Sequence, residues 1–314
     1  MKRSLLNHLI CPRCLPQERR LLEWTVQEEE EERDIIEGNL VCQTCGAMYP
    51  IRDGIAFLDP SSERLGRAVS KYEDESVLAS YLWSHFGDLL KDPEASEAYS
   101  HWSGLLLPQP GLCLDIGTAV GRFAFEMSRK ADFTIGLDNS VAFIKTAREL
   151  MLNRRKPIEL PEEGALTRQI ELHLPEDFDS RRMEFIVGDA LALPFASGTF
   201  SSQASLNMLD KVARPLDHLT EMNRTAATEQ AQCLVSDPFS WSEQTARQED
   251  WLGGKPTGAF SGRGLDNISA LLGGGNGFLR PAWTLKDRGS IWWKIRTHAN
   301  HFELIRSCYV TAVR

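Results

Sequence analysis

The pattern of apolar and polar positions changes at Gly111, where short apolar runs begin to alternate with helical stretches. The runs "LCLDI" (112–116) and "FTIGLD" (133–138) have the length and composition of buried parallel strands. The segments "FAFEMSRKA" (123–131) and "SVAFIKTARELML" (140–152) are predicted to be helices, the second with one apolar face. Strand–helix–strand units of this kind predict a doubly wound α/β sheet with helices on both faces.

The same alternation continues through three more predicted strands. "FIVGDALALPF" (185–195) contains a third strand and the loop after it, and "FSSQASLNMLD" (200–210) contains a fourth. A helix is predicted over "PLDHLTEMNRTA" (215–226), followed by a fifth strand in "AQCLVSDPF" (231–239). We therefore predict one main domain over residues 111–314.

The region before this domain, residues 60–110, is polar and helical in pattern and ends at Pro108 and Pro110. Two interpretations remain open: a helical bridge that packs on the main domain, or a lid over an active site. Both depend on the aromatic residues interleaved through the region, which are Tyr72, Tyr81, Trp83, Phe86, Tyr99 and Trp102.

The first 59 residues contain two Cys-x-x-Cys pairs separated by 27 residues. Four thiolates can fill the tetrahedral coordination sphere of zinc, which leaves no open position for a substrate. The spacing therefore predicts a small domain over residues 1–59, a zinc ribbon with a structural metal, and a metal-free ribbon is the alternative. The predicted ligands are Cys11, Cys14, Cys42 and Cys45.

Charge and hydropathy narrow the range of partners. The net charge is −9 and the sequence pI is about 5.4, so bulk electrostatics do not attract nucleic acid. Residues 1–58 carry 7 Lys and Arg against 10 Asp and Glu. No apolar run approaches the ~20 residues that span a bilayer, and the apolar run at the N-terminus is short and broken by Asn7 and His8. We predict a cytoplasmic protein with no membrane partner.

Carboxylates and glycines stand where predicted strands end. In "LDIGTAVGR", Gly117 and Gly121 allow close approach of a ligand to backbone, and Asp115 suits a cationic amino group better than a pyrophosphate. Asp138 ends the next strand, where a carboxylate can accept both hydroxyls of a ribose, and Asp189 follows the third strand. Each aspartate alone could be only a helix cap, but three in succession predict one binding site.

This constellation resembles the class I S-adenosylmethionine-dependent methyltransferases. The resemblance implies a Rossmann-like class I methyltransferase sheet with helices on both faces, preceded here by the small zinc-ribbon domain. It also implies S-adenosylmethionine as the cofactor. The residues that it assigns to the cofactor are Asp115, Gly117, Thr118 and Gly121 beside the methionine part, Asp138 and Asn139 at the ribose, Asp189 and Ala190 at the adenine, and Asn207 after the fourth strand.

The front domain has a resemblance of its own. The text "LICPRC…LVCQTCGAMYPIRDGIAFL", over residues 5–58, resembles the zinc-ribbon family that includes the small activator subunit of tRNA and protein methyltransferases. The resemblance implies a methyltransferase as its partner. In this chain the partner can be the rest of the polypeptide.

Residues 72–314 also resemble the C-terminal methyltransferase domain of ovothiol-synthesising enzymes. The resemblance rests on "YEDESVLASYLWSHFG", "SDPFSWSEQTARQEDWLGG" and "IWWKIRTHANHFELIRSCYVTAVR". It implies methylation of an imidazole nitrogen in a thiol-bearing histidine. Two departures put this substrate in doubt: the iron-dependent sulfoxide synthase portion is missing, and Thr118 stands where the family has a Cys or a similar small residue.

Methyl transfer from a sulfonium is an in-line displacement that needs positioning more than acid–base help. The predicted substrate-facing residues are therefore aromatic and polar groups near the strand ends: Tyr81, His85, Asn207 and Trp241. The predicted function is methylation of a small thiol- or imidazole-containing metabolite. The alternatives are an rRNA, tRNA or protein methyltransferase in which the ribbon presents the substrate, and a non-catalytic activator.

Overall fold

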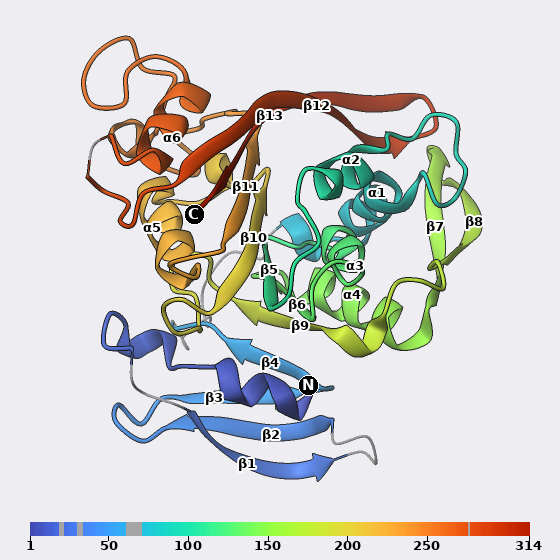
Figure 1. The fold of residues 1–314 in the computed structure, drawn as a ribbon. Helices are drawn as coiled ribbons and strands as arrows, with labels where there is room; N and C mark the ends of the chain where they lie inside the picture. The colour runs from blue at the N-terminus through green and yellow to red at the C-terminus, as the bar shows by residue number, and fades with distance from the viewer. Residues whose placement is uncertain (19–21, 30–33, 61–70, 276) are drawn as a thin grey trace.

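The computed structural model describes residues 1–18, 22–29, 34–60, 71–275 and 277–314. An eleven-stranded sheet runs through this part of the chain in the order β1-β2-β3-β4-β9-β6-β5-β10-β11-β13-β12, and β7 pairs with β8 in a separate hairpin (Figure 1). The strands are β1 Leu22–Glu29, β2 Ile35–Cys42, β3 Met48–Arg52, β4 Ile55–Leu58, β5 Leu112–Ile116, β6 Phe133–Asp138, β7 Arg155–Glu163, β8 Leu166–His173, β9 Met183–Gly188, β10 Phe200–Leu206, β11 Gln232–Asp237, β12 Thr284–His298 and β13 His301–Val313.

Helices pack on both faces of the sheet. None of those in the described ranges is both long enough and apolar enough to cross a membrane. The α-helices are α1 Glu75–Phe86, α2 Ala98–Gly104, α3 Arg122–Met127, α4 Val141–Asn153, α5 Pro215–Thr225 and α6 Gly264–Leu272, and the short 3-10 helices are η1 Arg3–His8, η2 Pro12–Cys14, η3 Lys71–Glu73, η4 Ser180–Arg182, η5 Leu209–Lys211 and η6 Gln248–Asp250.

The central strands confirm the predicted α/β class. β9, β6, β5, β10 and β11 are all parallel, and β13 is inserted antiparallel between β11 and β12. The chain proceeds outward from β5 in one direction to β6 and β9, and in the other to β10 and β11. The carboxyl ends of β5 and β10 therefore form a topological switch point, where open α/β sheets bind their ligands.

The two faces of the sheet have separate apolar cores. Leu219 of α5 and Ile268 of α6 pack with Leu114 and Ile135 on one face. Phe123 of α3 packs on the opposite face with α2 and the β12–β13 hairpin. With its two faces covered, the sheet exposes its binding loops only along its edges.

The zinc-ribbon strands continue the main sheet rather than forming a separate body. β4 pairs in parallel with β9, through Phe57 opposite Val187 and Leu58 opposite Gly188 (Figure 1). The domain boundaries predicted at residues 59 and 110 stay predictions, but hydrogen bonding crosses the first of them. A pattern of residues along the chain carries no signal for this pairing, because β4 and β9 are more than a hundred residues apart.

Charged residues reinforce this junction from inside. Glu184 of β9 is fully buried and pairs with Arg148 of α4, while its Oε2 accepts a hydrogen bond of 2.5 Å from the backbone N–H of Lys2. Arg148 also contacts Asp34 of the ribbon at 3.2 Å. Burial alone raises the pKa of Glu184, but Arg148, the N-terminal amine and Lys2 together outweigh it and hold that pKa below its usual value. The carboxylate is therefore ionised and matched by its partners.

Replacing Arg148 by Met should lower the free energy of unfolding by about 3–5 kcal/mol, because it leaves the buried Glu184 carboxylate without its main partner. Lys145→Met is the matched control on the same helix, since Lys145 is half exposed and lies 3.7 Å from an exposed Asp53. Denaturant unfolding of both variants measures the difference. Equal losses of unfolding free energy in the two variants would show that the buried Arg148–Glu184 pair stabilises the protein no more than an exposed pair does.

The region between ribbon and main domain is described from residue 71 onward, and residues 61–70 of the predicted bridge or lid lie outside the described residues. Helices α1 and α2 lie beneath the long β12–β13 hairpin (Figure 1). The hydroxyl of Ser84 donates a hydrogen bond of 2.6 Å to the carbonyl of Lys294 in β12. Because α1 also contacts β7, it is held between two hairpins.

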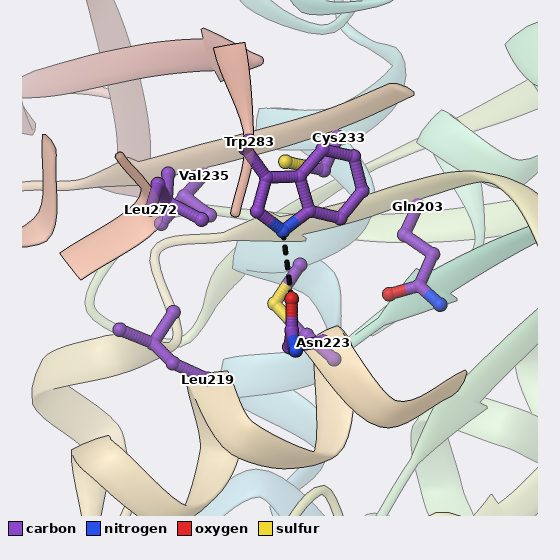
Figure 2. A pocket seen from close by; sticks show the side chains of 8 residues that line it. Gln203, Leu219, Asn223, Cys233, Val235, Leu272 and Trp283 are labelled. Atoms are coloured by element: carbon purple, nitrogen blue, oxygen red, sulfur yellow. Dashed lines mark hydrogen bonds between the residues drawn. The ribbon is translucent and has the colours of Figure 1, made fainter. Parts of the chain in front are cut away.

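A small cavity lies between α5, α6 and the sheet (Figure 2). Its volume is about 10 Å³, which is close to what one water molecule needs and far below the size of a cofactor. Trp283 Nε1 donates a hydrogen bond of 2.9 Å across it to Asn223 Oδ1. The cavity is a packing defect in the core and not the candidate functional site. Its lining residues are Gln203, Leu219, Met222, Asn223, Cys233, Val235, Leu272 and Trp283.

Candidate functional site

The loop after β5 brings the first predicted residues together. Asp115 is buried, and its Oδ2 accepts a hydrogen bond of 2.6 Å from the Thr118 hydroxyl. Gly117 has φ +75°, and a Cβ atom there would lie 2.2 Å from Cγ of Met208 in the loop after β10. Only glycine allows the two loops to approach this closely. The loops of β5 and β10 therefore meet at the switch point.

Burial determines the charge on Asp115. It raises the pKa of the carboxyl to about 7, although the hydrogen bond from Thr118 acts in the opposite direction. Near neutral pH, part of the population therefore carries a proton at Asp115. A cationic group beside it would restore the carboxylate, because an opposite charge favours the ionised form.

Asp138, at the end of β6, accepts hydrogen bonds from two neighbouring loops. Its Oδ2 accepts a hydrogen bond of 2.9 Å from Ala119 N, and its Oδ1 accepts one of 2.9 Å from Ser140 N. Burial raises the pKa of its carboxyl. Asn139 is exposed beside it. The carboxylate therefore links the glycine loop to the start of α4 and still lies at the edge of the sheet.

The third group of predicted cofactor residues lies in the loop after β9. Asp189 Oδ1 accepts a hydrogen bond of 2.9 Å from Leu191 N. This local hydrogen bond stabilises the turn that follows β9. The carbonyl of Ala190 lies 3.3 Å from Nδ1 of the buried His218. In the parallel register Asp138 stands opposite Val187 of β9, which brings Asp138 and Asp189 to the same edge.

Gly121 lies away from this edge. It precedes α3 with φ +90°, and a Cβ atom there would lie 2.7 Å from Cζ of Phe185 and 3.1 Å from Cβ of Ala147. The glycine thus permits close packing of the helix start on β9. Its predicted role beside the methionine part stays a prediction.

An aromatic cluster covers these loops from α1 and its neighbours. The ring of Tyr81 lies 4.8 Å from that of Phe143, at the start of α4, and 5.7 Å from that of His85. The His85 ring in turn lies 4.1 Å from the ring of Tyr99 on α2. We call this set the aromatic cluster and define it as Tyr72, Tyr81, His85, Tyr99, Trp102, Phe143 and Trp293.

His85 is the titratable member of the cluster. It is 3% exposed, and its Nε2 lies 2.6 Å from the Tyr99 hydroxyl. Its Nδ1 has no hydrogen-bond partner among the residues that the structure describes. Burial, with a smaller contribution from Arg122, lowers the pKa of His85 well below its usual value. The imidazole is therefore neutral at physiological pH.

The other two predicted substrate-facing residues take separate positions. Asn207 has φ +56°, donates its N–H to the Ser236 carbonyl at 2.6 Å and accepts a hydrogen bond of 2.6 Å from the Ser307 hydroxyl. Trp241 stacks on Trp251 at 6.3 Å, in the loop after β11. Among the described residues, the ring contacts of Trp241 therefore lie outside the aromatic cluster.

Two buried carboxylates tie the loops after β10 and β11 to each other. Asp210 Oδ2 accepts a hydrogen bond of 2.8 Å from Ser240 N, and Asp237 Oδ2 accepts one of 3.2 Å from Asp210 N. Burial and the neighbouring Asp210 raise the pKa of Asp237 well above its usual value. This reciprocal pairing fixes the spacing between Asn207 and Trp241.

Sequence reasoning did not assign Tyr72, Tyr99 or Trp293 to the site. Tyr99 contacts His85 directly, and the ring of Trp293 lies 6.3 Å from that of Tyr81. The available signal was the interleaving of aromatic residues in a polar helical region. That signal does not say which ring faces the strand ends.

The four predicted zinc ligands form one cluster. Their sulfur atoms all lie within 4.8 Å of one another, with Cys11 Sγ 3.7 Å from Cys45 Sγ and Cys14 Sγ 3.7 Å from Cys42 Sγ. Tetrahedral zinc with Zn–S bonds of about 2.3 Å places its sulfurs about 3.8 Å apart, so the cluster fits a structural zinc ion. Tyr49 adds an outer contact, with its hydroxyl 3.3 Å from Cys11 Sγ.

The cysteine cluster is joined to the loop after β9. Ile10, next to Cys11, donates its N–H to the Pro194 carbonyl at 2.9 Å. Leu9 forms an isolated bridge with Phe195, and both are fully buried. The first knuckle of the ribbon therefore holds the segment that follows Asp189 and Ala190.

Two protein families match parts of the chain. Residues 2–54 match the family described as Trm112p-like protein, and residues 114–229 match the family described as Methyltransferase domain. No curated protein matches the chain.

Solved structures resemble the chain at low identity. A complex between the Haloferax volcanii Trm112 methyltransferase activator and a methyltransferase has a TM-score of 0.45 and 13% identity, covering 79% of this chain and 99% of that one. An S-adenosylmethionine-dependent methyltransferase from Aquifex aeolicus has a TM-score of 0.45 and 12% identity, covering 76% and 97%. The YcgJ protein from Bacillus subtilis has a TM-score of 0.45 and 12% identity, covering 68% and 98%.

The doubly wound sheet and the family match to residues 114–229 define a class I methyltransferase domain. The donor set at the strand ends, which offers carboxylates to a ligand with amino and ribose groups, fits its usual cofactor. The chain is an S-adenosylmethionine-dependent methyltransferase that carries a Trm112p-like domain, with its four-cysteine cluster, in the same polypeptide.

Proposed function

We propose that this enzyme transfers the methyl group of S-adenosylmethionine to a thiolate or an imidazole nitrogen of a small metabolite. The observation that carries the proposal is the buried, neutral His85, whose Nδ1 has no partner within the described ranges and which lies in the aromatic cluster beside Tyr81. Such a setting suits a small, planar acceptor. The resemblance of residues 72–314 to the methyltransferase domain of ovothiol-synthesising enzymes supports the same substrate class.

The cofactor would bind along the carboxyl ends of β5, β6, β9 and β10. Asp115 would attract the amino group of its methionine part, and the glycine at 117 would admit its chain. Asp138, whose oxygens lie at the edge of the sheet, would bind the ribose. The remaining proposed contacts are Thr118 and Gly121 at the glycine loop, Asn139 at the ribose, Asp189 and Ala190 at the adenine, and Asn207 on the acceptor side.

The chemical step needs little from the protein beyond geometry. A lone pair on the acceptor forms the new bond to the methyl carbon while the carbon–sulfur bond breaks, and its electron pair returns the sulfonium to a neutral thioether. A thiolate acceptor releases no proton. An imidazole acceptor becomes a methylimidazolium, whose N–H can donate a hydrogen bond to His85 Nδ1 when Nε2 carries the hydrogen and donates to Tyr99, and whose proton passes to water after the product leaves. Tyr81 and Phe143 would exclude water from the path.

Cofactor affinity should depend on pH through Asp115. The carboxyl has a pKa of about 7, so protons compete with the cofactor amino group near and below that value, and the dissociation constant should rise about fivefold from pH 7 to pH 6. The raised pKa also means that the ligand-free protein loses stability as pH rises from about 4 toward 7. Calorimetric titration with S-adenosylhomocysteine measures the affinity. Asp115→Asn should bind weakly at every pH, and a sloping profile in that variant would contradict the assignment.

The substrate class is tested by the fate of labelled methyl groups. Enzyme and S-adenosylmethionine carrying a labelled methyl group are incubated with cell extract, which is then divided into a small-molecule and a macromolecular fraction. We expect the label in the small-molecule fraction, in a compound with a thiol or an imidazole. Label only in RNA or protein would contradict the proposal.

A macromolecular acceptor is the second candidate function. It is favoured by the match of residues 2–54 to the Trm112p-like family, because a solved complex that resembles this chain is described as one between a Trm112 methyltransferase activator and a methyltransferase. The resemblance of residues 5–58 to a family that includes the activator subunit of tRNA and protein methyltransferases supports the same function. In this chain β4 of the ribbon ends beside β9, next to the loop of Asp189. Label in the macromolecular fraction, lost on digestion with ribonuclease or protease, would favour this function.

A further inference from the structure

We propose that the methyl acceptor is a planar heteroaromatic molecule oriented by two buried polar groups, Trp293 Nε1 and His85 Nδ1. The proposal rests on the proposed function, because it concerns the acceptor side of the same site. It assigns a specificity-determining role to Trp293, a residue of β12 that reaches the aromatic cluster from above α1 and α2.

Two buried ring nitrogens of the aromatic cluster, Trp293 Nε1 and His85 Nδ1, have no hydrogen-bond partner within the described ranges. Trp293 is 5% exposed, and its indole N–H has no acceptor in the described part of the chain. Other buried indoles of the region have one: Trp83 donates to Asp92 at 2.8 Å, and Trp102 donates to the Ser236 hydroxyl at 3.1 Å. A buried donor or acceptor without a partner costs about 1–3 kcal/mol, so two such atoms in one cluster favour a ligand that satisfies them.

The rings of Trp293 and His85 share Tyr81 as a neighbour. The ring of Tyr81 lies 6.3 Å from that of Trp293, at an interplanar angle of 74°, and 5.7 Å from that of His85. Both unpaired nitrogens therefore belong to rings that border Tyr81. Aromatic rings at these distances favour stacked and edge-on contacts with another ring.

Arg122 is a buried cation beside His85. The guanidinium of Arg122 donates to the carbonyl of His85, but its charge is matched by Asp88 at 2.6 Å and Glu126 at 2.7 Å. This cation is therefore committed to its two carboxylates and does not offer a binding site for a phosphate. The cluster suits a ligand without phosphate.

The two unpaired nitrogens also limit which ligand atoms can face them. An indole N–H can only donate, so the ligand atom that faces Trp293 must be an acceptor such as a thiolate, a carbonyl oxygen or a ring nitrogen. Neutral His85 can donate or accept, according to its tautomer. A thiol-bearing imidazole offers an acceptor and a ring N–H in one plane and so matches both groups.

The test compares Trp293→Phe, which keeps an aromatic ring but removes the indole N–H together with the five-membered ring that carries it, with Trp292→Phe, which makes the same change outside the cluster. Trp292 is the adjacent residue, is 55% exposed and lies outside the cluster. The probe is 2-mercaptoimidazole, titrated into the complex of each protein with S-adenosylhomocysteine. We expect Trp293→Phe to weaken probe binding about tenfold, Trp292→Phe to change it less than twofold, and neither to change the affinity for S-adenosylhomocysteine.

A second measurement does not depend on a variant that folds. In the wild-type protein, the indole N–H resonance of Trp293 should move on addition of the probe, and that of Trp292 should not. No binding of the probe to the wild-type complex, or equal binding to Trp293→Phe, would overturn the inference. Label transfer to macromolecules only, in the extract experiment above, would instead overturn the proposed function and leave the Trp293-dependent binding of the probe as a separate result.

Discussion

Asp138→Ala should weaken the binding of S-adenosylmethionine by more than 100-fold, which corresponds to about 3 kcal/mol. The expected loss is that of two hydrogen bonds between a carboxylate and ribose hydroxyls, at about 1.5–3 kcal/mol each. The substitution also removes the acceptor of Ala119 N and Ser140 N, so the glycine loop and the start of α4 lose their common anchor. Calorimetry with S-adenosylhomocysteine measures the affinity.

Asp132→Ala is the matched control for this variant. Asp132 lies just before the opposite end of β6, is exposed, and accepts a hydrogen bond of 2.8 Å from Gly111 N. The Asp132→Ala variant therefore loses the same kind of side chain and a similar hydrogen bond to backbone. The change lies away from the strand ends that form the site. Equal losses of affinity in the two variants would show that Asp138 acts through general stability and does not contact the ribose.

Removal of zinc from the four-cysteine cluster should lower the stability of the protein more than any other change considered above. We expect Cys14→Ser, or exposure to a strong chelator, to destabilise the ribbon by an amount comparable to the binding energy of structural zinc, which is about 10–16 kcal/mol in small zinc domains. The ribbon would then release Pro194 and Phe195, and the preceding loop of Asp189 and Ala190, which we propose for the adenine, would lose its support. Thermal unfolding and cofactor affinity should therefore fall together.

Cys308→Ser is the control for the metal ligands. Cys308 lies half-buried in β13, paired in register with Asp237, and is not a member of the four-cysteine cluster. Its substitution should leave bound zinc, measured by atomic absorption, at one ion per chain. A zinc-free Cys14→Ser protein with the wild-type melting temperature and full cofactor affinity would contradict a structural role for the cluster.

The sequence predicted the fold well where a strand is short, apolar and buried on both faces. β5 and β6 coincide with "LCLDI" and "FTIGLD", and α4 ends within a residue of the predicted helix. Local composition suffices there because burial on two faces demands an uninterrupted apolar run. The pairing of β4 with β9 depends on contacts between distant segments and was not predicted.

In the candidate site, too, local sequence predicts some residues, and contacts between distant segments determine the others. The strand-end residues Asp115, Asp138 and Asp189 could be found from spacing, because parallel strands bring their carboxyl ends to one edge. The structure groups Tyr81 and His85 with Tyr99 and Trp293, which lie on α2 and β12. Nothing in the spacing of these residues shows that a hairpin near the end of the chain covers α1, so the role of Trp293 became visible only in the fold.

The methyl group of the bound cofactor should face the aromatic cluster, and nuclear Overhauser contacts from that methyl group report its neighbours. In the complex with S-adenosylmethionine carrying a carbon-13 methyl group, filtered nuclear Overhauser spectra should show contacts from that methyl to ring protons of Tyr81 and His85. A bound cofactor whose methyl group contacts neither ring, and instead lies against residues outside the cluster, would contradict the account.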